Sequence, residues 1–191
     1  MIDIVDLTLL FALRYVEPTV WRRATVSGDF VLSDLHQVIQ ELFDWDDAHL
    51  WQFEFGNDLY SPGDDEFDDM TPRGKTHSNA DETILVVALG RRKKFSYTYD
   101  FGDDWQIDIA VERRAEASAV KIPVCLDGAR AGWPDDCGGP PGYAHLCEAM
   151  ADPKHPDHAE MSDWIGDEWN AEEFDIKEIN RGLKRGFAGL K

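Results

Sequence analysis

The chain has 191 residues, of which 43% are hydrophobic and 12% aromatic, and its formal net charge is −19. This length and composition are typical of one globular domain with a sizeable core and exclude a disordered chain. The negative charge argues against tight binding to duplex DNA or to an anionic membrane, because phosphate groups repel an acidic surface. A protein that mimics DNA would also carry such a charge.

Two features of the sequence predict a cytoplasmic protein with no membrane partner. The longest apolar run, residues 84–89, is too short to cross a bilayer, and the first residues lack a basic and then apolar signal pattern. The three cysteines are an odd number at low density, which agrees with a reducing compartment. They are Cys125, Cys137 and Cys147.

Hydrophobic patterns in the first part of the chain predict two strands, a helix and a third strand. In residues 7–16 large apolar and aromatic side chains occupy every odd position from Leu7 to Tyr15, which puts them on one face of a strand. Residues 20–26 are also β-prone, so a hairpin is expected. Residues 35–43 carry an apolar stripe at helical spacing, and Ser33 can cap that helix. Trp51, Phe53 and Phe55 alternate with polar residues as a further strand.

Two stretches are less regular. Residues 56–81 are rich in Gly, Pro, Asp and Glu, which predicts a solvated loop. Its acidic run lacks the spacing of a calcium loop and consists of Asp64, Asp65, Glu66, Asp68 and Asp69. Residues 84–89 fit either a buried strand or a short helix, because periodicity does not decide between the two.

The stretch YTYDFGDDWQIDI at residues 97–109 predicts a β-hairpin. Alternating apolar residues on both sides of a short Gly-containing segment indicate two strands, at 95–99 and 105–111. Asp100, Asp103 and Asp104 then lie at its tip.

Residues 123–142 are rich in proline and glycine, which predicts a structured loop. Ordering so long a loop requires compensating contacts, so we expect it to fold over the end of the sheet near residues 100–104, with Trp133 as its anchor.

Three helices are predicted after this loop. Residues 143–150 form one apolar stripe, and residues 156–165 form the next helix, which Gly166 closes. The third helix opens on Asp175, with Glu178 at capping-box spacing. We divide the chain into residues 1–122 and residues 123–191, packed as one domain.

Five phrases of the sequence occur together in one known family. They are WRR at 21–23, LHQVIQELFDW at 35–45, YDFGDDW at 99–105, CLDGARAGWPDDCGGPPGY at 125–143 and ADPKHPDH at 151–158. Over residues 5–185 the chain thereby resembles the plasmid pRiA4b ORF-3-like family of bacterial and archaeal proteins.

The resemblance implies an α+β fold, with a mixed sheet similar to a ubiquitin-like β-grasp, one packed helix and a C-terminal three-helix segment. The predicted order of hairpin, helix and further strands agrees with it. The family has no established biochemical activity, and its occurrence in insertion sequences implies a link to mobile genetic elements. Two positions depart from the family pattern: Ile107 replaces a usual histidine, and Gly132 replaces a frequent cysteine.

The aspartate cluster at 100–104 is open to three interpretations. A strained turn selects Gly for positive φ and Asp for hydrogen bonds to its own backbone. Alternatively, Asp103 and Asp104 bind a divalent cation, or the cluster is a binding site of another kind. Because Ile107 falls on the apolar face where the family has a histidine, a turn is the first expectation.

Cys125, Cys137, His145 and Cys147 include the residue types of a zinc site. However, no C-x-x-C pair is present, and a free cysteine is usually a small buried hydrophobe. A catalytic thiol at Cys137 has no identifiable base. We therefore predict no cofactor, with a divalent metal as the alternative.

The sequence contains no complete catalytic set, so the leading hypothesis is a non-enzymatic binding or accessory module with a protein partner. The alternative is a metal-dependent hydrolase that acts on a phosphoester through the aspartate cluster. The expected binding surface lies between the hairpin tip and the Pro/Gly loop. It consists of Asp100, Asp103, Asp104, Trp105, Asp135, Asp136, Cys137 and Tyr143.

Overall fold

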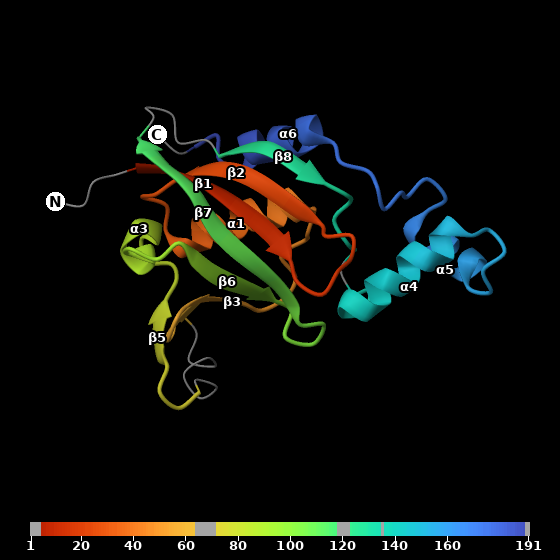
Figure 1. Ribbon diagram of the computed structural model, residues 1–191, viewed down its shortest axis with the longest axis horizontal. Helices are drawn as coiled ribbons and strands as arrows, with labels where there is room; N and C mark the ends of the chain where they lie inside the picture. Colours follow the sequence, from red (N-terminus) through yellow and green to blue (C-terminus); the bar gives the residue numbers. More distant parts are fainter. Residues whose placement is uncertain (1–4, 64–71, 118–122, 135, 190–191) are drawn as a thin grey trace.

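Figure 1 shows the computed structural model of the protein, which describes residues 5–63, 72–117, 123–134 and 136–189. Its strands are β1 (Val5–Leu13), β2 (Trp21–Ser27), β3 (Trp51–Phe55), β4 (Asp58–Ser61), β5 (Thr76–Asn79), β6 (Lys94–Tyr99), β7 (Trp105–Glu116) and β8 (Val124–Ala129). Its helices are α1 (Leu32–Phe43), α3 (Leu85–Leu89), α4 (Gly139–Ala151), α5 (His158–Ile165) and α6 (Ile176–Gly186). The predicted α+β class is confirmed.

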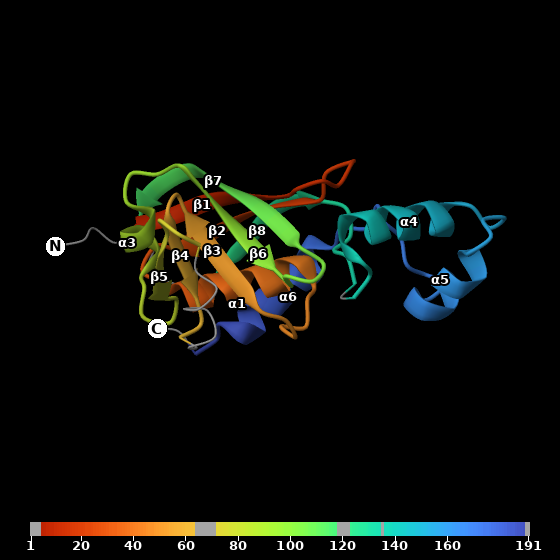
Figure 2. The same ribbon diagram turned by 90° about the horizontal axis from the view of Figure 1, so that it is seen from below.

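Within the described ranges, the strands form one eight-stranded sheet in the order β5-β4-β3-β6-β7-β1-β2-β8. The sheet is mixed, because β4 and β5 are parallel while the other neighbours are antiparallel. Helices α1 and α6 cover one face of the sheet, whereas α4 and α5 project beyond its end (Figure 2). The sheet is larger than the one expected, and its topology does not confirm a β-grasp arrangement.

The predicted hairpins and the first helix are confirmed, and most of their apolar residues reach the core. The inward positions of β1, β6 and β7 are buried, and so is the whole stripe of α1: Leu35, Val38, Ile39, Leu42 and Phe43. Tyr15 is an exception. It is 76% exposed, since β1 ends at Leu13 and Tyr15 lies in the following turn at a φ of 63°.

The structure corrects two predicted details, the cap of helix α1 and the loop at 56–81, and it decides between the two alternatives for residues 84–89. Helix α1 is not capped by Ser33: the backbone N–H of Val31 at its N-cap donates to the Asp34 carboxylate at 3.1 Å. The predicted loop at 56–81 contains β4 and β5. The acidic run in this stretch, residues 64–69, lies outside the described residues. Residues 84–89 contain helix α3 rather than a strand.

Strand β8 corrects the prediction that residues 123–142 form a loop throughout. It pairs with β2 at the edge of the sheet, and Cys125 is its only buried residue, so it lacks an apolar alternation. Helix α4 also begins earlier than predicted, at Gly139, with proline in its first turn, where the fixed φ of proline suits a helix. The loop proper is therefore the stretch of residues 130–138.

Helix α5 ends and helix α6 begins as predicted, but α5 starts at His158 rather than at Pro156. The chain leaves α5 at Gly166, and the Asp175 carboxylate caps α6 by accepting the N–H groups of Lys177 and Glu178 at 2.8 and 3.1 Å. The Asn180 side chain then ties α6 to the backbone of β8. No described helix is long and apolar enough to cross a bilayer. The predicted division at residue 122 falls outside the described residues.

Candidate functional site

The segment between β6 and β7 is a tight turn, as the first interpretation of the aspartate cluster predicts. Asp100 and Asp104 have φ values of 52° and 54°. The Oδ1 atom of Asp100 accepts the N–H groups of Gly102 and Asp103 at 2.9 and 3.4 Å. The Asp104 carboxylate accepts both of its hydrogen bonds from Gln106, at 2.9 and 3.0 Å. The turn is thus held by its own side chains.

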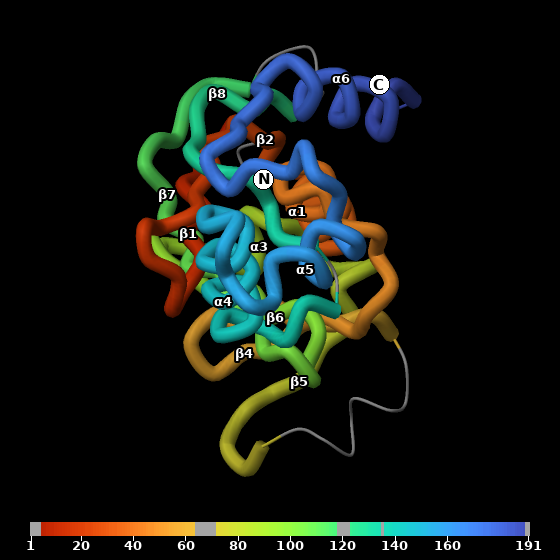
Figure 3. The backbone as a smooth tube through the Cα atoms, turned by 90° about the vertical axis from the view of Figure 1, so that its right-hand side faces the viewer, coloured from red at the N-terminus to blue at the C-terminus, as the bar shows by residue number. Residues whose placement is uncertain are grey.

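The Pro/Gly loop lies against this turn, as predicted. The Gly138 N–H donates to Oδ2 of Asp103 at 3.0 Å. Trp133 is 1% exposed and stacks on Trp105 with ring centroids 4.4 Å apart. It also meets Trp45 edge-on at 4.2 Å. Trp133 is therefore the anchor that fixes the loop on the end of the sheet. Figure 3 views the molecule from the side on which α4 and α5 lie.

Not every residue of the predicted binding surface is at the surface. Trp105 and Tyr143 are buried and serve as packing residues. Burial raises the pKa of the Tyr143 hydroxyl, which donates to the carbonyl of Ala131 at 3.4 Å. Asp136 is exposed and Cys137 is half-buried, while Asp135 lies outside the described residues.

His49, which the sequence did not single out, joins the turn to the loop. It lies in the connection between α1 and β3, with Nδ1 3.8 Å from Oδ2 of Asp100 and Nε2 3.6 Å from Oδ1 of Asp136. These three residues come from three separate segments. Their spacing in the sequence carries no motif, so only the fold brings them together.

The structure does not bring Cys125, Cys137 and His145 together as a zinc set. Cys125 is buried on β8, where burial raises the pKa of its thiol. His145 instead lies beside Asp157 and His155, with its Nε2 3.2 Å from Oδ2 of Asp157. Asp103 and Asp104 accept hydrogen bonds from different partners, Gly138 and Gln106, and neither belongs to a group of three or more possible metal ligands among the described residues.

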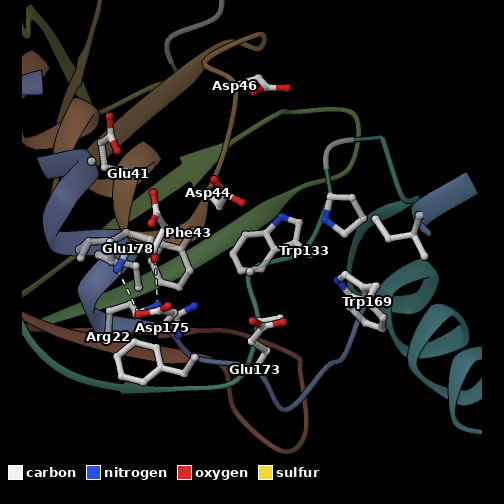
Figure 4. Close-up of a pocket in the computed structure, with 18 of the residues that line it drawn as sticks. Arg22, Glu41, Phe43, Asp44, Asp46, Trp133, Trp169, Glu173, Asp175 and Glu178 are labelled. Atoms are coloured by element: carbon white, nitrogen blue, oxygen red, sulfur yellow. Dashed lines mark hydrogen bonds between the residues drawn. The ribbon is translucent and has the colours of Figure 1, made fainter. Parts of the chain in front are cut away.

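A groove of about 800 Å³ lies between helices α1 and α6 on one side and helix α5 on the other. Figure 4 shows Trp133 between Phe43 and Trp169, with Asp44 and Glu173 on either side of it. Among the described residues, seven carboxylates and two arginines line the groove. The acidic side chains are those of Glu41, Asp44, Asp46, Asp136, Glu173, Asp175 and Glu178.

The Arg22 cation at the base of the groove has a structural role. It is buried and donates to the carbonyls of Leu42, Trp21 and Ala129 at 2.8, 2.9 and 2.9 Å. Its guanidinium lies between the rings of Phe43 and Phe174, 5.1 and 5.0 Å from their centroids. Burial lowers its pKa to about 10, so the group stays cationic at neutral pH. This charge is thus engaged by groups of the protein itself.

Comparison with known proteins shows the family of the chain. A family model described as "Plasmid pRiA4b ORF-3-like protein" matches residues 6–178. The chain belongs to this family. "Uncharacterized protein y4hQ" of Sinorhizobium fredii (strain NBRC 101917 / NGR234) is similar, with 34% identity over 176 residues that cover 92% of this chain and 89% of that protein.

A solved structure shares the fold of this family member. The crystal structure of a protein of unknown function, MM3350 from Methanosarcina mazei Go1, is similar with a TM-score of 0.81 and 30% identity. The match covers 93% of this chain and 98% of that one.

Proposed function

We propose that this protein is a non-enzymatic binding module that holds a lysine- or arginine-rich segment of a protein partner in the groove. The observation that carries the proposal is a groove that seven carboxylates line together with tryptophan and phenylalanine side chains. A volume of about 800 Å³ is enough for several side chains of such a segment.

Charge complementarity selects a cationic occupant. Seven carboxylates against two arginines give the described lining a negative charge, and the Arg22 charge is already engaged by carbonyls and rings. The net charge of −19 extends this field beyond the groove and attracts a basic partner during encounter.

The tryptophan side chains of the groove supply a second kind of contact. Trp164 is 47% exposed although it is a large apolar side chain, and Trp169 lines the groove beside Trp133. Indole faces attract lysine and arginine cations, with contributions of about 0.5–1 kcal/mol at exposed sites. A groove lined by carboxylates and indole side chains thus favours basic side chains over neutral or acidic ones.

Other predicted properties remain predictions. The alternative of a metal-dependent phosphoester hydrolase also stays a prediction, and we do not adopt it because Asp103 and Asp104 lie in no group of three possible metal ligands among the described residues. A cytoplasmic location, a β-grasp-like first part, a link to mobile elements and weak binding to duplex DNA are still to be tested.

The proposal is tested by titrating the protein with octalysine and following tryptophan fluorescence. The triple variant Asp44→Asn, Asp46→Asn, Glu173→Gln is expected to bind about threefold to a hundredfold more weakly than wild type, since each exposed charge pair contributes about 0.2–1 kcal/mol. Added salt should weaken binding to the wild type by screening these charges.

A matched triple variant controls for net charge. Asp81→Asn, Glu82→Gln, Glu116→Gln removes the same three charges from the region between β5 and α3 and from the end of β7, away from α4 and α5. Its affinity should stay within about twofold of wild type. Equal losses in both triple variants, or no binding of octalysine to the wild type, would overturn the proposal.

A further inference from the structure

Three segments meet at the end of the sheet, and each contributes one group that can bind a metal. The α1–β3 connection supplies His49, the β6–β7 turn supplies Asp100, and the Pro/Gly loop supplies Asp136. One ligand atom from each residue lies within 4.8 Å of the other two. Asp100 is only 14% exposed at its side chain, and the Oδ1 atom is occupied by the turn, which leaves Oδ2 facing His49.

The same three segments also hold buried nitrogens that lack a partner. In the described part of the chain, four buried side-chain nitrogens have no hydrogen-bond partner: Nε2 of His49 and the indole nitrogens of Trp45, Trp105 and Trp133. Trp45 belongs to the α1–β3 connection, Trp105 follows the turn, and Trp133 lies in the loop. The three indoles are more than nine-tenths buried and touch one another through Trp133.

Buried polar atoms are nearly always hydrogen-bonded, so this gathering requires an explanation. Of these four nitrogens only Nε2 of His49 can ligate a metal, because an indole N–H group is a donor only. Nε2 of His49 is shielded from solvent and lies 3.6 Å from a carboxylate oxygen of Asp136, which is a normal separation for two ligands of one metal ion.

We propose that His49, Asp100 and Asp136 bind a divalent transition-metal cation that links the Pro/Gly loop to the end of the sheet. One imidazole nitrogen with two carboxylates suits Zn²⁺ or Mn²⁺ better than Mg²⁺, which prefers oxygen ligands and keeps its water. Asp136 is 82% exposed, so the ion can enter from solvent and retain water as a further ligand. Asp136 also lines the acidic groove, but the metal site is argued from its contacts with His49 and from Asp100, which the groove lining does not include.

The test is calorimetric titration of the EDTA-treated, dialysed full-length chain with ZnCl₂ and with MnCl₂. We expect one site per chain and a metal-dependent rise of the thermal unfolding midpoint. Asp136→Asn should weaken binding at least tenfold and abolish the rise. The exposure of Asp136 makes it a substitution that the fold tolerates, so loss of binding would not reflect unfolding.

A second group of possible ligands provides the matched control. His145, His155 and Asp157 also lie within reach of one another, on α4 and the turn that follows it. Asp157→Asn should leave the affinity unchanged. The proposal is overturned if neither metal binds at 1 mM, or if Asp157→Asn rather than Asp136→Asn removes binding.

Discussion

Replacing Trp133 with alanine is expected to lower the free energy of unfolding by about 3–5 kcal/mol, the usual cost of removing a buried tryptophan. Trp133 is 1% exposed and contacts Trp45, Trp105 and Phe43 with centroid distances of 4.2, 4.4 and 5.3 Å. No other side chain can fill the space it leaves without moving the loop, so the loop should also become accessible to proteases. Urea unfolding measures the loss.

Trp164 supplies the matched comparison, because it is a tryptophan that is 47% exposed on α5. Trp164→Ala should change the free energy of unfolding by no more than about 0.5 kcal/mol, as for most surface substitutions. A Trp133→Ala variant that is as stable as Trp164→Ala would show that the loop does not depend on this anchor.

The Gly139→Ala substitution is expected to cost about 2–4 kcal/mol of stability, because it brings two penalties together. Gly139 has a φ of +68°, a conformation that a side chain disfavours. A Cβ atom there would also lie 2.5 Å from the backbone oxygen of Asp103, so the loop and the turn would have to separate. Thermal or urea unfolding of the variant measures the cost.

Gly166→Ala separates the two penalties. Gly166 has a φ of +97°, but a Cβ atom there would meet no other atom within 4 Å. This variant should therefore lose only the conformational part, about 1–2 kcal/mol. If both glycine variants lose the same amount, the close approach of the loop to the turn does not limit stability.

The central part of the fold could be predicted from the sequence because its periodicity is strong. Strands β1, β3 and β6 and the first five residues of β7 bury every second residue, and α1 buries a complete stripe. Such patterns arise when one face of an element packs on a core and the other meets solvent. The cap of α6 was also predictable, since Asp175 and Glu178 have local spacing.

The edges of the sheet could not be predicted in the same way. Strand β5 has the sequence THSN with no buried residue, and β8 buries little besides Cys125. These strands are held by backbone hydrogen bonds to a neighbour, and backbone pairing leaves no pattern in the side chains. Their sequences therefore look like the loops around them.

One feature of the candidate sites could be predicted from the sequence, and two could not. The contact between the turn and the Pro/Gly loop was predictable, because glycines, prolines and a lone large aromatic residue indicated a loop that needs an anchor. His49 and the acidic groove were not, since His49 is 51 positions from Asp100 and the groove draws residues from α1, α5 and α6. Only the folded chain places these residues side by side.

The most direct test of the binding proposal is an NMR titration that observes the indole N–H groups of the seven tryptophans while octalysine is added. Because Trp164 and Trp169 line the groove, their resonances should shift in proportion to occupancy, whereas those of Trp21 on β2 and Trp51 on β3 should stay in place. Shifts at Trp21 and Trp51 as large as those at Trp164 and Trp169, or no shift at any tryptophan, would contradict the proposed binding site.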